Sequence, residues 1–171
     1  MRRISIAFCV LVAQVAMAQS GNGNYVVVDM GKVKPYWTIA KKGEPIRLPK
    51  SAMHKHAEGC VSVGFSIEAD GKPANPIVLR SGFTDKADKQ VVQDIEQRVL
   101  RNFSSAQWVA ADSNPDHKPV YTYGTYSFSL YEQPATKSDV DKRSDFVSAT
   151  CEIPDFPAAV ARGDLVKKPA L

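Results

Sequence analysis

The stretch from Gly59 to Ser81 constrains the fold of this chain more strongly than any other part of the sequence. Apolar side chains alternate there with small or polar ones, which is typical of a β-strand with one buried face: Val61, Val63, Phe65 and Ile67. Asp70-Gly71 follows and supplies a turn that tolerates positive φ. A second β-rich run, Ile77-Val78-Leu79, comes next, so the stretch predicts a β-hairpin.

The segments after the hairpin predict a helix and a third strand. Residues 85–101 have one apolar face at helical spacing, and Thr84 suits the N-cap position. The apolar face consists of Val91, Val92, Ile95, Val99 and Leu100. Residues 103–119 are typical of a loop, with a turn at Asn114-Pro115-Asp116. Val120 to Leu130 alternates again and predicts a third long strand.

The segments before the hairpin predict another helix and an edge strand. Pro49 suits the first turn of a helix over residues 50–58 that stops at Gly59. Tyr25 to Met30 is short and β-rich, whereas Gly31 to Pro45 predicts irregular structure. Together the elements predict an α+β fold with an antiparallel three-stranded sheet, a candidate fourth edge strand at Tyr25–Met30, and two helices.

Both ends of the chain lie outside this pattern. Arg2 and Arg3, the apolar run Ile4 to Val15, and the small residues around Ala18 predict a signal peptide over residues 1–18, cleaved after Ala18. The apolar run is too short for a membrane anchor, which needs about 20 apolar residues. The predicted organisation is a signal peptide (1–18), an N-terminal extension (19–47), a folded domain (48–131) and a C-terminal extension (132–171) with a helix near 138–150.

Two cysteines remain after signal cleavage, Cys60 and Cys151. An even number in an exported chain predicts a disulfide, and two separately buried thiols are the alternative. The bond would close a loop of about 90 residues and tie the C-terminal extension to the first hairpin strand, for roughly 4–5 kcal/mol in the chain-entropy model.

Neither nucleic-acid binding nor catalysis is indicated. Without Arg2 and Arg3 the chain has 20 basic and 18 acidic residues, a net charge of +2, and the charges are scattered. His54 and His56 precede Cys60, but residues two apart on a helix point in different directions. No metal site or cofactor is therefore expected. The chain also has no G-x-S-x-G, Cys-x-x-Cys or phosphate-loop motif, so a metal-binding or hydrolytic enzyme is the least favoured function.

From Leu48 to Leu130 the pattern resembles the periplasmic C-terminal domain of TonB-type energy transducers. The matching segments are LPKSAMHKHAEG, GCVSVGFSIEADGK, IVLRS, VVQDIEQRVLRNF and PVYTYGTYSFSL, which together span about half of the exported chain. The resemblance implies a periplasmic domain that recognises short extended peptides by adding a strand to a sheet edge. In that family, the peptide lies near the N-terminus of an outer-membrane transporter.

The resemblance also implies where a peptide would bind. By position, the family's final strand maps onto Pro119 to Leu130, which makes Tyr121, Tyr123, Thr125 and Ser127 the candidate peptide-binding edge. The alternative is a half-exposed strand face that favours aromatic residues. The chain departs from the family at Leu48-Pro49, where the family has a Tyr-Pro pair, and it shows neither a long Pro-rich spacer nor a membrane helix with a Ser and a His. A periplasmic relative without the anchor is therefore expected.

Two function classes stay open. The first is a non-catalytic protein-binding module of the periplasm, without a membrane span after cleavage, that captures an extended peptide or an envelope protein. An outer-membrane transporter is a candidate partner. The second is a structural or assembly protein of the cell envelope, whose sheet edge is covered by its own N-terminal segment and tied tail. A homodimer is a candidate assembly for either class.

Overall fold

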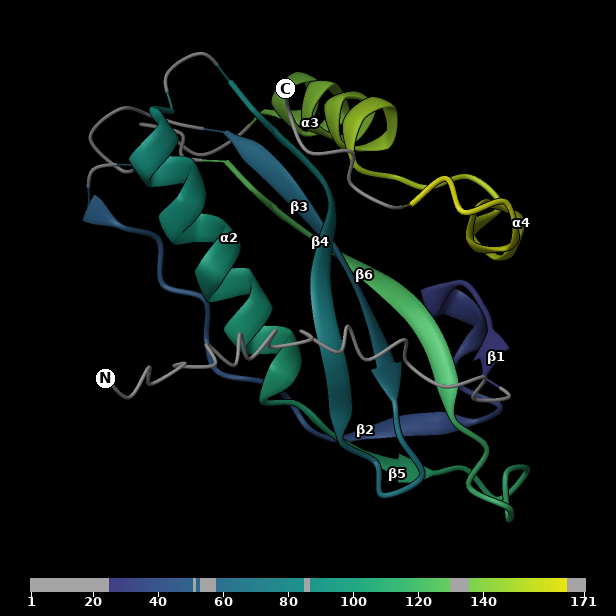
Figure 1. Ribbon diagram of the computed structural model, residues 1–171. Helices are drawn as coiled ribbons and strands as arrows, with labels where there is room; N and C mark the ends of the chain where they lie inside the picture. The colour runs from purple at the N-terminus through teal and green to yellow at the C-terminus, as the bar shows by residue number, and fades with distance from the viewer. Residues whose placement is uncertain (1–24, 51, 53–57, 85–86, 130–135, 166–171) are drawn as a thin grey trace, which may run out of the picture.

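A four-stranded sheet with helices on both faces forms the centre of the protein (Figure 1). The computed structural model describes residues 25–50, 52, 58–84, 87–129 and 136–165. In the sheet the strand order is β1-β6-β3-β4, and a separate two-stranded sheet pairs β2 with β5. The strands are β1 (Val26–Val27), β2 (Trp37–Lys41), β3 (Gly59–Ile67), β4 (Pro73–Phe83), β5 (Gln107–Ala110) and β6 (Val120–Phe128).

The β3–β4 hairpin predicted from the sequence is present, with β4 starting four residues earlier than Ile77. Gly71 adopts φ 76° in the turn, and its backbone N–H donates to the Glu68 carbonyl. Every residue of β3 is buried. The prediction of one buried face is therefore too narrow, because the C-terminal extension covers the side on which the polar residues lie.

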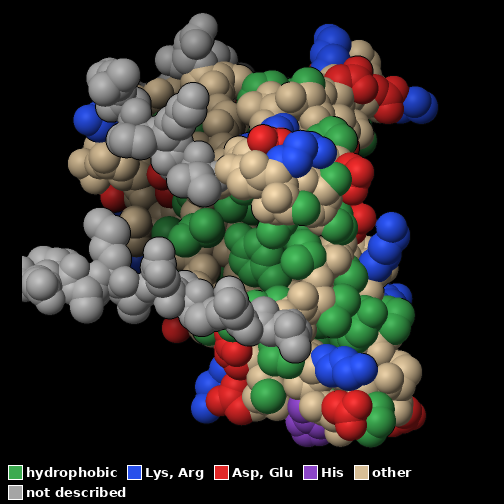
Figure 2. Space-filling model, turned by 45° about the vertical axis from the view of Figure 1, so that its right-hand side comes forward, with side chains coloured by type: hydrophobic (Ala, Val, Ile, Leu, Met, Phe, Trp, Pro, Cys, Tyr) green, Lys and Arg blue, Asp and Glu red, His purple; other side chains and the backbone are tan. Residues whose placement is uncertain are grey.

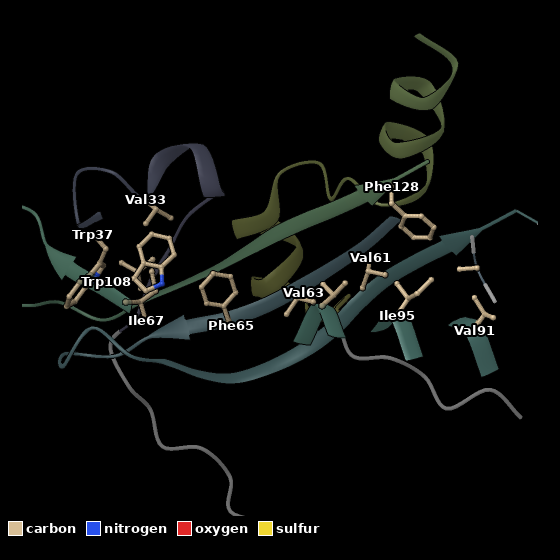
Figure 3. Close-up of a cluster of buried hydrophobic side chains, with 13 residues drawn as sticks. Val33, Trp37, Val61, Val63, Phe65, Ile67, Val91, Ile95, Trp108 and Phe128 are labelled. Carbon is tan, nitrogen blue, oxygen red and sulfur yellow. The ribbon is translucent and has the colours of Figure 1, made fainter. Parts of the chain in front are cut away.

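The helix predicted after the hairpin is α2 (Lys89–Ser104), which buries Val91, Ile95 and Val99 against the sheet. These side chains meet the apolar face of β3 in the main core, together with Trp37, Trp108 and Phe128 (Figure 3). The N-cap is Asp88, whose side chain accepts from the Val91 N–H at 2.9 Å. Thr84, the N-cap predicted from the sequence, instead accepts a hydrogen bond from the Glu58 N–H.

The sheet is mixed, whereas the sequence predicted an antiparallel three-stranded sheet with one candidate edge strand. β6 pairs antiparallel with β3 along its whole length. The segment Tyr25–Met30 does supply the fourth strand, β1, but it runs parallel to β6 and pairs only with Val120 and Tyr121.

The second sheet differs from the sequence prediction, which gives irregular structure for residues 31–45 and a loop for residues 103–119. After a short 3₁₀ turn, η1 (Met30–Lys32), β2 pairs with β5. Each strand carries one buried indole ring. Trp37 Nε1 donates to the Lys118 carbonyl at 3.0 Å, whereas Trp108 is held through its backbone N–H, which donates to the Gly71 carbonyl at 3.0 Å. Only one residue of β2 is buried, so no alternation signals the strand. The turn predicted at Asn114-Pro115-Asp116 is present, with Lys118 N–H bonded to the Asn114 side chain.

The C-terminal extension contributes two helices, α3 (Lys137–Thr150) and α4 (Phe156–Ala161). Thr136 and Asp139 form a reciprocal capping box at the start of α3, which accounts for its position. The helix predicted at 50–58 lies mostly outside the described residues, as do the signal peptide, His54 and His56. In the part of the chain that is described, no helix combines the length and apolar character that a bilayer crossing requires.

Candidate protein-binding edge

The outer edge of β6 is the part of the sheet where a partner strand could pair. The N–H groups of Val26 and Val28 donate to the carbonyls of Pro119 and Tyr121, at 3.0 and 3.1 Å. Backbone polar groups alternate in direction along a strand, so the odd-numbered residues of β6 point to this edge and the even-numbered ones to β3. β1 therefore covers the edge only at the start of β6.

Beyond β1 the edge is open among the residues that the structure describes. The outward-facing backbone groups there belong to Tyr123, Thr125 and Ser127, and no strand pairs with them. The side chains of Thr125 and Ser127 are exposed. Chain after Val28 turns away into η1, whose neighbour Val33 is buried in the main core. An open stretch of about five residues follows from this geometry.

The side chains of the predicted site residues point to the sheet face that carries the C-terminal extension. Tyr121 and Tyr123 pack against Phe156, with ring centroids 5.5 and 4.8 Å apart. The Tyr123 hydroxyl accepts from the Ile153 N–H at 3.3 Å and donates to the Ile153 carbonyl at 3.4 Å. The side chains of these two tyrosines contact the C-terminal extension. A partner at this edge would therefore meet backbone N–H and C=O groups.

Thr125, which is exposed, bonds to a buried polar group beneath the same edge. Its hydroxyl lies 2.7 Å from the Ser62 hydroxyl, which donates to the Cys151 carbonyl at 2.6 Å. Since Ser62 has one proton, this arrangement makes Thr125 the donor to Ser62. This series of hydrogen bonds links β6, β3 and the extension, and it leaves the Thr125 backbone N–H directed outward.

A disulfide fixes the extension to the centre of the sheet. Cys60 on β3 and Cys151 after α3 are bonded, as the sequence predicts, with Cα atoms 6.2 Å apart and no exposed surface on either residue. Arg80 on β4 adds a hydrogen bond to the Glu152 carbonyl at 2.7 Å. A second apolar cluster then forms around Leu79, Ile153, Phe156 and Ala159. Sequence reasoning missed Phe156 and Ile153, because a Pro-rich tail has no periodic pattern to mark them.

Burial changes the acidity of the phenols beside the edge. Tyr121 lies under the extension, and loss of solvent raises its pKa above the usual value. The pKa of Tyr126, on the opposite face, is raised for the same reason. Both phenols therefore stay neutral at physiological pH and act as apolar packing groups.

A small cleft adjoins the open end of the edge. It has a volume of about 260 Å³ and is lined by Ser127, by Glu152 after α3, and by one side of α3: Val140, Arg143, Ser144, Val147 and Ser148. Its walls combine aliphatic, hydroxyl and charged groups. A strand paired with Thr125 and Ser127 would place alternate side chains next to this cleft.

The opposite edge of the sheet, on β4, is less suited to pairing. Pro73 and Pro76 lack an N–H, and Asn75 between them adopts φ 51°. The register of β3 against β4 also shifts twice. Prolines and bulges are the usual means of blocking edge-to-edge association. Of the two edges, only the β6 edge is free of prolines and register shifts in the described residues.

In the described part of the chain, no three His, Cys, Asp or Glu side chains are grouped so that they could hold a metal ion. His117 lies in the turn before β6, where its ring contacts the Ala69 carbonyl and the edge of Trp37. Figure 2 shows basic and acidic side chains interspersed on one face, with hydrophobic side chains gathered at its middle. This mixture matches the nearly balanced charge of the sequence.

No family model and no curated protein matches this chain. Two solved structures are similar to it, and both are TonB C-terminal domains. The domain from Pseudomonas aeruginosa aligns over 62% of this chain and 96% of its own length, with a TM-score of 0.43 and 15% identity. The domain from Helicobacter pylori aligns over 52% and 72%, with a TM-score of 0.32 and 26% identity. The structural similarity thus involves the same family as the sequence resemblance.

Proposed function

We propose that this protein is a non-catalytic binding module of the bacterial envelope, which captures an extended protein segment by pairing it with β6 at Tyr123–Ser127. The observation that carries the proposal is the open backbone edge beyond β1. An extended peptide would satisfy the outward N–H and C=O groups of three residues. Each such hydrogen bond contributes about 0.5–1.5 kcal/mol net, so backbone pairing alone gives modest affinity.

Selectivity would come from the side chains beside the edge. The cleft formed by Ser127 and α3 offers Val140 and Val147 to an apolar side chain and Arg143 to an acidic one. Edge pairing with side-chain pockets is the general mode of β-strand addition. A partner with an alternating sequence, one acidic residue and a free strand end fits this surface best.

The cellular setting is part of the same proposal. The signal sequence at residues 1–18 and the Cys60–Cys151 disulfide support an oxidising, extracytoplasmic compartment, which we take to be the periplasm. The TonB-like pattern over residues 48–131 supports an outer-membrane transporter as a candidate partner. Residues 132–171 would be an extension particular to this chain.

The test is a pair of substitutions at one position. Thr125→Pro removes the outward N–H while leaving the bonds of β6 to β3 in place, and Thr125→Ala removes the same hydroxyl but keeps the N–H. A photo-crosslinker at Ser127, with a matched one at Ile77 on β4, reports capture of envelope proteins. We expect a specific adduct at Ser127 that survives in Thr125→Ala and disappears in Thr125→Pro. An adduct that persists in Thr125→Pro would exclude edge pairing.

A structural or assembly role is the second candidate, and the pairing of β1 with β6 is the observation that favours it. In this case the protein's own N-terminal segment covers the edge, and the sheet needs no partner strand. Deleting residues 19–28 distinguishes the two functions. Because β1 pairs only with Val120 and Tyr121, edge capture predicts that crosslinking at Ser127 persists after the deletion, whereas a structural role predicts loss of stability without adducts.

A further inference from the structure

A cluster of arginines lies on the outer side of α2, away from the β6 edge. The segment that follows β2 runs alongside α2 (Figure 1) and is fixed to its C-terminal end. Asn102 Nδ2 donates to the Glu44 carbonyl at 2.7 Å, and the Glu44 N–H donates to Ser105 Oγ at 2.8 Å. Gly43 comes so close to the Asn102 backbone that a side chain there would clash. The segment is therefore held in a defined position.

This arrangement encloses a cavity of about 330 Å³, lined by Glu44, Pro45, Arg47, Arg98 and Arg101. The two arginines on α2 are three residues apart and so share one side of the helix. Arg47 comes from the opposite wall. Within the described residues, none of the three guanidinium groups forms an ion pair, and Arg98 Nε is buried with no hydrogen-bond partner. The cavity thus gathers three guanidinium groups that no carboxylate of the described residues pairs at ion-pair distance.

Helix electrostatics explain only part of this cluster. Arg101 lies in the last turn of α2, where a cation interacts favourably with the helix dipole. That role does not account for Arg47 on the facing segment or for the unpaired Nε of Arg98. The local charge is three positive groups against one carboxylate, Glu44, a net charge of +2. A dianion would neutralise it.

We propose that this cavity binds a dianionic phosphate group, held by Arg47, Arg98 and Arg101. Guanidinium groups present paired N–H donors that match phosphate oxygens, and charge-assisted bonds of this kind are the strong ones. The phosphate could belong to a soluble phosphomonoester or to a lipid headgroup. The proposal is independent of the β6 edge, because the cavity is built from α2 and the segment before residue 48.

The test uses glycerol phosphate and the ¹⁵N-labelled protein, followed by NMR. We expect saturable shifts at Arg47, Arg98 and Arg101 with a Kd of about 1 mM or tighter. Binding should weaken at least about tenfold at pH 5 relative to pH 8, because the second pKa of a phosphomonoester is about 6. Vesicles of phosphatidylcholine with and without phosphatidic acid distinguish the lipid source: stronger binding to the acidic vesicles identifies a headgroup.

Two variants and a matched control decide the outcome. R98Q/R101Q should lose at least about tenfold in affinity for glycerol phosphate, by removing two charged donor groups. R47Q, at an exposed position outside any helix, should lose several-fold and keeps the test informative if the double variant unfolds. K137Q/K142Q removes the same charge from α3, outside the cleft beside Ser127, and should change binding less than about twofold. The proposal is wrong if no probe binds saturably, or if the α3 variant loses as much affinity as R98Q/R101Q.

Discussion

The two faces of the central strand β3 are built on different principles. Towards α2 it presents Val61, Val63, Phe65 and Ile67 to a continuous apolar core. Towards the C-terminal extension it presents a half-cystine and small or hydroxyl residues: Cys60, Ser62, Gly64 and Ser66. Both faces are fully buried, yet only the first is apolar. The alternating sequence of a strand therefore predicts which face is apolar, but it does not predict that the other face is exposed to solvent.

The polar face of β3 tolerates burial because its hydroxyl groups are hydrogen-bonded and its glycine has no side chain. Ser62 donates to Cys151, and Ser66 donates to Glu68 at 2.6 Å. A side chain at Gly64 would lie 2.7 Å from the Tyr121 hydroxyl and 2.9 Å from Leu79, so only glycine fits without displacement. Buried hydroxyls cost little when hydrogen-bonded. The polar face thus binds the C-terminal extension, whereas the apolar face packs against α2 and forms the main core.

The largest expected effect comes from breaking the α2 face. Ile95→Ala removes a fully buried side chain from the main core, and we expect the free energy of unfolding to fall by about 2–5 kcal/mol. Urea unfolding followed by circular dichroism measures it. Gln93→Ala, exposed on the same helix, is the control and should change stability by less than about 0.5 kcal/mol. A loss below about 1 kcal/mol at Ile95 would mean that the α2 face is not the main source of stability.

Removing the disulfide breaks the other face. C60A/C151A should cost about 2–4 kcal/mol and should free α3 and α4 while the β3–β4 hairpin and α2 stay folded. Limited proteolysis should then cut near residue 151 before it cuts the sheet. Wild-type protein treated with reductant is the matched comparison. Simultaneous loss of the α2 core would show that the extension is an integral part of the domain.

A smaller effect is expected from one hydroxyl on each face. Tyr123→Phe removes two hydrogen bonds to Ile153 and should cost about 1 kcal/mol. Tyr126→Phe, on the α2 side of the same strand, is the matched control. Its hydroxyl has no hydrogen-bond partner among the residues that the structure describes, so its cost should be close to zero. Equal effects on urea midpoints at the two positions would contradict the assignment of Tyr123 to the extension.

The smallest effect concerns alkaline pH. Burial raises the pKa of Tyr121 above that of the unfolded chain, so the unfolded state loses this proton first as the pH rises. The stability contributed by the neutral phenol is fully present below about pH 10 and declines above it. Tyr121→Phe should flatten this decline in a series of urea titrations from pH 8 to pH 11. An unchanged decline would place the phenol in solvent.

The sequence predicted the elements with strong periodicity. The β3–β4 hairpin, α2 and β6 carry clear period-two or helical patterns, and each is present. The Cys60–Cys151 bond followed from counting cysteines in an exported chain. The strands and the helix can be predicted from local sequence patterns, and the disulfide from the number of cysteines, without knowledge of tertiary contacts.

The features that the sequence did not predict depend on tertiary contacts. β2 and β5 are short strands that contain the buried residues Trp37 and Trp108. Only Trp37 is buried in β2, and β5 has four residues, too few for its alternating burial to be recognised in the sequence. Asp88, rather than Thr84, caps α2 because the Thr84 hydroxyl is bonded to the Glu58 N–H. The sequence interpretation put the candidate site on the last strand, and whether a partner binds there stays a prediction. Only the structure separates the side chains of Tyr121 and Tyr123, which contact the extension, from the open backbone edge beyond β1.

Amide hydrogen exchange along β6 tests the central claim, an open stretch of edge on a sheet covered on both faces. Thr122, Gly124 and Tyr126 direct their N–H groups to β3 and should exchange slowly, near the global unfolding limit. Tyr123, Thr125 and Ser127 direct theirs outward and should exchange orders of magnitude faster. Alternating protection of this kind is the predicted result. Uniform slow exchange over residues 122–127 would show that the edge is already paired, and would contradict the account.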